Sequence, residues 1–273
     1  MTTFQDGLRA RPAVIAVLHA PPLPGAARAA LALETITAHV VSDAAAAAAG
    51  GADALLLENF GDAPFTRRRV GPEVVAVMTR LALAVRAAAP LPLGINVLRN
   101  DACAALAVAQ AAGGSFIRVN VLAGVVATDQ GLVMGEAARV LAFRRRIGAE
   151  GIAILADVDV KHGRPLWGES IAGRAADLCE RSLADALIVT GPATGEAPIL
   201  EDLEHVRRAC PGMPILAGSG VTPANAARLL PGCRGVIAGT GLKIGGQVAA
   251  PIARERVAEL VTAARSAWAS APP

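Results

Sequence analysis

The sequence predicts a (β/α)8 barrel that occupies residues 1–273 as a single domain. Short apolar runs recur along the chain, each too short for a helix and continuous enough for a strand buried on both faces. An Ala-rich helical pattern follows each run. Eight such pairs, spaced at about 34 residues, match the size of a βαβ unit and the count of this barrel.

The predicted elements follow one another without a linker or a low-complexity segment. The strands are expected at Ala13–Leu18, Ala54–Leu57, Leu93–Leu98, Phe116–Val121, Ile152–Val158, Ala186–Val189, Ile215–Ala217 and Gly235–Ala238. The helices are expected at Thr35–Ala49, Pro72–Ala88, Ala102–Ala112, Glu136–Ile147, Ile171–Ser182, Leu200–Ala209, Pro223–Leu229 and Ala253–Ala269.

Capping residues support several of these boundaries. Asp101 and Ser170 precede predicted helices and are typical N-caps, and Thr222-Pro223 combines an N-cap with a proline at the first helical position. An open, doubly wound sheet is the alternative fold. That fold usually carries a glycine-rich dinucleotide turn after its first strand, whereas here the segment His19–Gly25 is rich in proline.

Composition and charge exclude several classes of protein. With 53% hydrophobic and 18% charged residues, the chain is neither disordered nor a small disulfide-stapled module. A net charge of +3 does not predict a nucleic-acid partner. We expect no membrane insertion, because no uncharged apolar stretch reaches about 18 residues. The N-terminus lacks a signal-peptide pattern, so we expect a cytoplasmic protein.

The four cysteines are scattered without a C-x-x-C pair. We therefore expect reduced, mostly structural thiols and neither a zinc site nor a disulfide framework. The Ala-rich helices favour association of several copies, so we expect a homo-oligomer.

Polar residues gather where the predicted strands end, which is where such barrels place their active sites. The candidates for acid, base or nucleophile are His19, Glu58, Asp157, Asp159, Lys161 and His162. The candidates for substrate binding are Asn96, Arg118, Asn120 and Thr190. The alternative interpretation is a structural ion pair of the Arg118–Asp157 type. Lys161 could form a Schiff base with a carbonyl substrate or simply anchor a phosphate or carboxylate.

The last two predicted strands carry glycine-rich turns typical of phosphate-binding barrels. Glycine lets backbone N–H groups approach an anion closely. We expect phosphate to be bound by Gly218, Ser219, Gly220, Gly239, Thr240 and Lys243. No cofactor is predicted with certainty. A divalent metal would use Glu58 and Asp157, with Asn96 or Asn120 as a further oxygen ligand, although no tight metal spacing is present.

Several strings together resemble the BtpA/SgcQ family. They are Val17–Gly25, Glu58–Phe65, Gly94–Asp101, Phe116–Asn120, Ala156–His162 and Gly218–Thr222, and the resemblance extends over about residues 12–260. It implies a (β/α)8 barrel, in agreement with the strand count. The founding member of the family is linked to the biogenesis of photosystem I.

Phosphoribosylanthranilate isomerase is a barrel with a Cys base on strand 1 and an Asp acid on strand 6. This chain carries His19 and Thr190 there, so it does not resemble a typical member of that enzyme family.

Two hypotheses follow. The first is an enzyme acting on a phosphorylated sugar or nucleotide-like molecule, as an isomerase, a lyase or a glycosidase, with the carboxylates and Lys161 as acid and base. The second is a non-catalytic assembly or stability factor for a membrane complex such as photosystem I.

Overall fold

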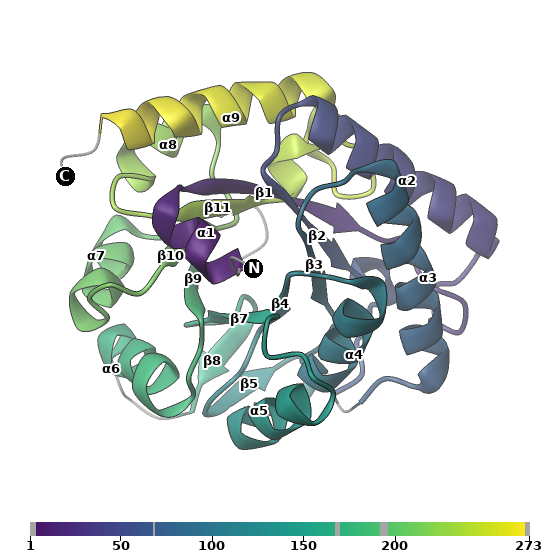
Figure 1. Ribbon diagram of the computed structural model, residues 1–273, viewed down its shortest axis with the longest axis horizontal. Coiled ribbons are helices and arrows are strands. Elements are labelled where there is room, and N and C mark those ends of the chain that lie inside the picture. The colour runs from purple at the N-terminus through teal and green to yellow at the C-terminus, as the bar shows by residue number, and fades with distance from the viewer. Residues whose placement is uncertain (1–3, 68, 167–169, 192–195, 271–273) are drawn as a thin grey trace.

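Eight parallel strands close into a barrel in the computed structural model, which describes residues 4–67, 69–166, 170–191 and 196–270. Their spatial order is β1-β11-β10-β9-β7-β4-β3-β2 (Figure 1). The predicted fold class is confirmed. The open-sheet alternative is wrong, because β1 pairs with both β2 and β11 and the sheet has no edge. The strands are β1 (Ala13–His19), β2 (Ala54–Glu58), β3 (Leu93–Asn96), β4 (Phe116–Val119), β7 (Ala153–Asp157), β9 (Ala186–Thr190), β10 (Ile215–Gly218) and β11 (Gly235–Ala238).

A ring of helices covers the outside of the barrel (Figure 1). These are α2 (Leu33–Ala49), α3 (Pro72–Ala88), α4 (Ala102–Ala112), α5 (Ala137–Arg146), α6 (Ile171–Ala176), α7 (Leu200–Ala209), α8 (Pro223–Leu229) and α9 (Arg254–Ala269). Two of the predicted caps are confirmed, since the side chains of Asp101 and Ser170 accept hydrogen bonds from the backbone N–H groups of Ala104 and Gly173. After α6 the chain widens into a π-helical turn, Asp177–Arg181, which the sequence pattern did not predict.

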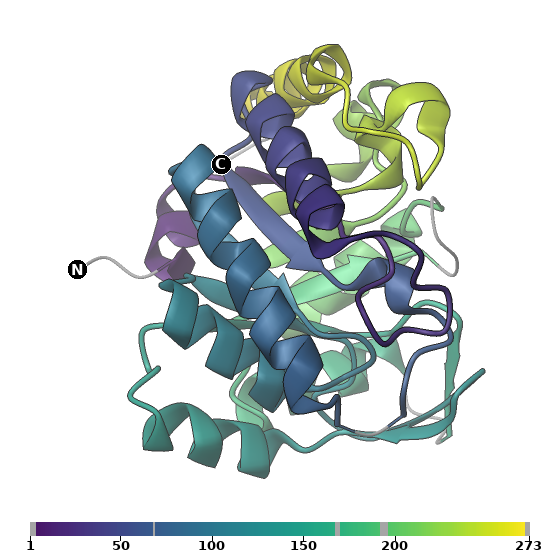
Figure 2. The ribbon, with the colours of Figure 1, turned by 90° about the vertical axis from the view of Figure 1, so that its right-hand side faces the viewer.

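Two further features lie outside the eight predicted pairs. Helix α1 (Phe4–Ala10) covers the amino-terminal end of the barrel, where Phe4 stacks on Phe116 with ring centroids 4.3 Å apart (Figure 1). At the opposite end, β5 (Val125–Thr128) and β6 (Gly131–Met134) form an antiparallel hairpin that projects beyond the barrel (Figure 2). The short strand β8 (Gly163–Pro165) joins it as a third strand.

The alternation of side chains along each strand decides which residues reach the barrel mouth. On β1, Val14, Ala16 and Leu18 belong to the core beneath the helices, whereas Ile15 and Val17 belong to the core inside the barrel. The next inward position on each strand forms the layer at the mouth. That layer consists of His19, Glu58, Asn96, Arg118, Asp157, Thr190, Gly218 and Gly239.

No helix within the described ranges is long and apolar enough to cross a membrane.

A buried ion pair ties the loop after β11 to helix α2. Lys243 is fully buried, and its Nζ donates to Oδ2 of Asp43 across 2.6 Å. The other carboxylate oxygen of Asp43 accepts the backbone N–H of Ile252 at 2.8 Å. The pair therefore fixes both ends of the loop that precedes α9.

Replacing Asp43 with Ala is expected to destabilise the protein by about 3–5 kcal/mol, because it leaves the Lys243 ammonium buried without a counter-charge. Urea denaturation measures the change. Arg208→Ala, which breaks the exposed pair with Glu204, is the control and should barely move the midpoint. Equal effects of the two variants would contradict the burial argument.

Candidate functional site

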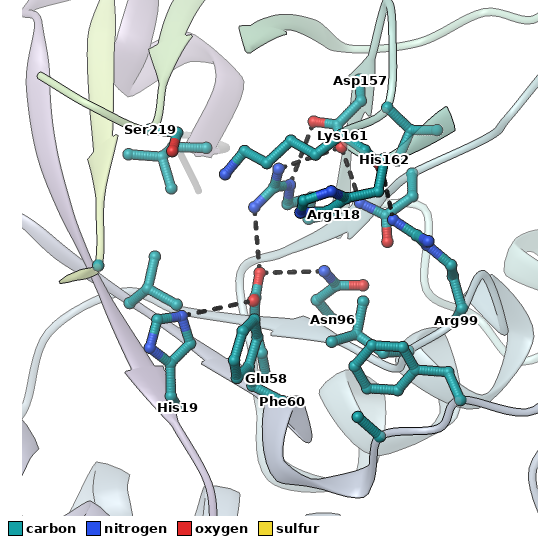
Figure 3. Close-up of a pocket in the computed structure, with 18 of the residues that line it drawn as sticks. His19, Glu58, Phe60, Asn96, Arg99, Arg118, Asp157, Lys161, His162 and Ser219 are labelled. Carbon is teal, nitrogen blue, oxygen red and sulfur yellow. Dashed lines mark hydrogen bonds and ion pairs between the residues drawn. The ribbon is translucent and has the colours of Figure 1, made fainter. Parts of the chain in front are cut away.

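Most of the predicted site residues line one cavity of about 480 Å³ at the carboxyl ends of the strands (Figure 3). The cavity lies opposite α1, and the β5–β6 hairpin contributes to its wall. Of the residues predicted for the site, it is lined by His19, Glu58, Asn96, Arg118, Asn120, Asp157, Lys161, His162, Ser219, Gly239 and Thr240.

Arg118 organises the floor of this cavity. Its Nε and Nη2 donate to the two carboxylate oxygens of Asp157, each at 3.1 Å, and its Nη1 donates to Oε1 of Glu58 at 3.2 Å (Figure 3). The planar guanidinium suits this two-pronged contact. Asn96 donates to the same Glu58 oxygen at 3.0 Å, and Asn120 donates to Asp157 at 2.7 Å.

This network keeps Glu58 ionised. Burial by itself would raise the pKa of the Glu58 carboxyl, but Arg118, His19 and the hydrogen bond from Asn96 outweigh burial and hold the pKa below its ordinary value. The same two carboxylates raise the pKa of Arg118 against the effect of burial. Glu58 is therefore a hydrogen-bond acceptor at neutral pH, and it has no proton to donate.

The same contacts test whether Glu58 and Asp157 could bind the divalent metal suggested by the sequence. The Arg118 guanidinium bridges Glu58 and Asp157, so it already supplies the cation between the two carboxylates. Within the described part of the chain, no group of three or more His, Cys, Asp or Glu side chains is placed to hold a metal ion. The donor set therefore does not fit a divalent metal.

Lys161 is a cation of this site whose ammonium group is made strongly more acidic by its surroundings. Burial, reinforced by the positive charge of Arg118, lowers the pKa of its ammonium from 10.5 to about 8. Figure 3 shows the side chain extending across the cavity toward the side of Ser219. A substantial fraction of Lys161 is thus a neutral amine near pH 8, which is the form that accepts a proton or attacks a carbonyl.

His19 forms the wall beside Glu58. Burial lowers the pKa of its imidazole from 6.5 to about 4, although the nearby Glu58 carboxylate opposes the shift. The ring lies 4.4 Å from the ring of Phe60, and its Nε2 is 4.0 Å from Glu58. His19 is therefore neutral at physiological pH. Its buried Nδ1 has no hydrogen-bond partner among the described residues.

A second cavity of about 420 Å³ adjoins the first and shares Ser219, Gly239 and Thr240 with it. Its lining is made largely by the turns after β10 and β11. Ser219 and Gly220 both have left-handed backbones, with φ of 71° and 61°. A Cβ at Gly220 would lie 2.2 Å from the backbone of Glu196, so only glycine fits that position.

Five predicted residues lie outside the lining of the main cavity: Gly220, which lines the smaller cavity, and the four described next. Asp159 is paired with Arg174 at 2.7 Å, and the hydroxyl of Thr190 donates to the backbone carbonyl of Asp159 at 2.9 Å. Gly218 packs against β9, where a Cβ would lie 2.7 Å from Ile188. The Lys243 ammonium is buried and paired with Asp43, so it is a structural group and is not placed to bind phosphate.

Other residues lining the cavity were absent from the predicted set. Arg99 joins three loops, because it donates to Oε1 of Gln130 at 3.0 Å and to the backbone carbonyl of Lys161 at 2.8 Å. Phe60 and Phe65 add an aromatic wall. The hairpin could have been recognised, since apolar runs flank the turn residues Asp129-Gln130-Gly131. The sequence does not show which loops this hairpin contacts in the folded protein.

The comparison with known proteins agrees with this architecture. The model of the BtpA family matches residues 10–266. The chain belongs to the BtpA family. It is 44% identical to the photosystem I biogenesis protein BtpA of a Synechocystis strain, over 95% of this chain and 90% of the relative. It is also 44% identical to a protein of Archaeoglobus fulgidus, over 92% of this chain and 98% of the relative.

Solved structures with the same fold are more distant. Tryptophan synthase of Mycobacterium tuberculosis is similar with a TM-score of 0.63 and 17% identity, covering 97% of this chain and 99% of the other. The (S)-3-O-geranylgeranylglyceryl phosphate synthase of Thermoplasma acidophilum has a TM-score of 0.60 and 15% identity, covering 97% and 100%. At this identity the likeness shows that this BtpA-family protein shares their barrel fold.

Replacing Arg118 with Met should leave Glu58 and Asp157 buried without their cation and destabilise the protein by about 3–5 kcal/mol. The pH dependence should also change sign. In the wild type the pKa of Glu58 is lowered, so its contribution is present above about pH 4.5 and is lost as pH falls. Without Arg118 that pKa is raised by burial, so stability should fall as pH increases from 5 to 7.

Denaturant unfolding at several pH values measures this effect. Arg174→Met, which breaks the more exposed pair with Asp159, is the control and should leave the slope unchanged. An unchanged slope in Arg118→Met would show that the network does not hold the charge of Glu58.

Proposed function

We propose that the protein is an enzyme that acts on a small phosphorylated and hydroxylated molecule, of the sugar or nucleotide-like type, through proton transfer or imine chemistry at Lys161. The observation that carries the proposal is that the two cavities adjoin. A space lined by backbone turns suited to an anion shares Ser219, Gly239 and Thr240 with the cavity whose buried floor holds Glu58, Arg118 and Asp157.

The floor favours a ligand rich in hydrogen-bond donors. Asp157 accepts from Asn120, and that contact orients the amide so that Oδ1 of Asn120 is left as a buried acceptor without a partner among the described residues. Glu58 adds an ionised carboxylate. A buried acceptor costs free energy unless a donor meets it, and sugar hydroxyls are suitable donors.

Lys161 supplies the group for the chemistry. Its amine can remove a proton beside a carbonyl, or attack an aldehyde or ketone to form an imine with loss of water. Both routes support isomerase or lyase chemistry. Glycosidic cleavage finds less support, because it requires a protonated carboxyl group and the pKa of Glu58 is lowered.

Two solved structures with the same barrel fold provide an analogy for phosphate binding. The geranylgeranylglyceryl phosphate synthase structure contains the substrate sn-glycerol-1-phosphate, and phosphoribosylanthranilate isomerase of Pyrococcus furiosus shares the barrel with a TM-score of 0.54. A shared barrel raises the expectation of a phosphate site but does not define a reaction.

The relative named for photosystem I biogenesis favours a second candidate, an assembly factor. Its test is co-purification: retention of one membrane complex by a protein that binds no phosphorylated compound would favour this function over catalysis.

A thermal-shift screen with inorganic phosphate, sugar phosphates and nucleoside monophosphates should find a stabilising ligand. At about 100 times its Kd, a ligand adds roughly 2.7 kcal/mol of stability, which is a clear rise in Tm. Ser219→Gly, which also relaxes the left-handed backbone, and Thr240→Val should weaken the response, whereas Arg208→Ala should not. The absence of a response to every phosphorylated compound would contradict the proposal.

Once a substrate is found, Lys161→Met should lower kcat by about 10²–10⁴-fold, the usual size of an acid–base contribution. In the wild type, kcat/KM should rise as the amine loses its proton near pH 8. If Lys161 is only an anion anchor, Lys161→Arg would retain kcat and the limb near pH 8 would be absent. Reduction with borohydride separates the two routes, because only an imine leaves the substrate covalently attached.

A further inference from the structure

The fold brings together two cysteines that lie far apart in the sequence. Cys179 lies in the π-helical turn after α6, and Cys210 follows the last residue of α7, 31 positions later. Their Sγ atoms are 2.9 Å apart. Both are reduced in this structure, as are Cys103 and Cys233.

We propose that Cys179 and Cys210 form a reversible disulfide, a modification site separate from the cavity at the barrel mouth. It does not depend on the proposed function. The sequence predicts reduced, mostly structural thiols because the cysteines are scattered along the chain. The fold brings two of them into contact.

The π-helical turn supports the assignment. Ser182 donates its backbone N–H to the carbonyl of Asp177, five residues earlier, which widens the helix at the turn that carries Cys179. Single π turns often mark functional positions in helices. Here the turn lies beside the end of α7, and it presents the partly exposed Cys179 to the buried Cys210.

The chemistry needs an oxidant, and a low-molecular-weight disulfide is the class that fits. The Cys179 thiolate attacks one sulfur of that disulfide and releases the first small thiol, leaving a mixed disulfide on Cys179. The Cys210 thiolate then attacks the Cys179 sulfur and releases the second small thiol. The two protons lost by the protein thiols end on the two released thiols, and the protein is oxidised by two electrons.

Burial raises the pKa of both thiols, and their mutual contact raises that of Cys179 further, so the first step should be slow at neutral pH and faster in alkaline solution. The covalent loop would contain β9 and Glu196. Glu196, which lines the smaller cavity with Ser219, lies within this loop.

The test treats the reduced protein with oxidised glutathione and then alkylates the remaining thiols with iodoacetamide in denaturant. Mass spectrometry should find four alkylated cysteines before oxidation and two afterwards, with a peptide that joins Cys179 to Cys210. Without reductant, the oxidised protein should also have a higher Tm, because the cross-link restricts the unfolded chain.

Matched variants make the result specific. Cys103→Ser and Cys233→Ser should still lose two free thiols on oxidation, whereas Cys179→Ser and Cys210→Ser should form no intramolecular bond. Cys179→Ala provides a second replacement if serine disturbs folding. Four alkylated cysteines after oxidation, a glutathione adduct that persists on Cys179, or disulfide-linked dimers would each overturn the proposal.

Discussion

The contact of Arg118 with Glu58 and Asp157 is the interaction on which the candidate site depends. These three side chains come from β4, β2 and β7 and are almost completely buried. Two carboxylates so close together in a dry environment would favour protonation, and one guanidinium shared between them keeps Glu58 charged. The Glu58 carboxylate is therefore a fixed, ionised part of the cavity floor and not a proton donor.

The charge of this floor defines what the neighbouring groups can do. Asn96 and Asn120 donate their amide N–H groups to the carboxylates. His19 is neutral because burial outweighs the attraction of Glu58, and Lys161 loses part of its proton affinity because burial and Arg118 act in the same direction. Glu58 therefore stays ionised, whereas Lys161 can gain or lose its proton near pH 8.

Closure of the barrel explains why residues so distant in the sequence meet. Inward positions alternate along every strand, and the last inward position of each strand lies in one layer. Glycine occupies that layer on β10 and β11, where it leaves room next to His19 and β9. The same two strands lead into the turns that line the smaller cavity, so the cavity with the polar floor and the proposed anion site share Ser219, Gly239 and Thr240.

The sequence by itself determined the barrel, because runs buried on both faces and a regular repeat length leave few other ways to cover eight parallel strands. It also determined the set of polar residues at the strand ends, since Glu58, Arg118 and Asp157 interrupt apolar runs at those points. Only the tertiary structure decided their partners. It placed Lys243 with Asp43 beneath the surface, Asp159 with Arg174 outside the main cavity, and Cys179 against Cys210. These pairings depend on how helices and loops pack around the barrel. The spacing of residues along one strand does not predict that packing.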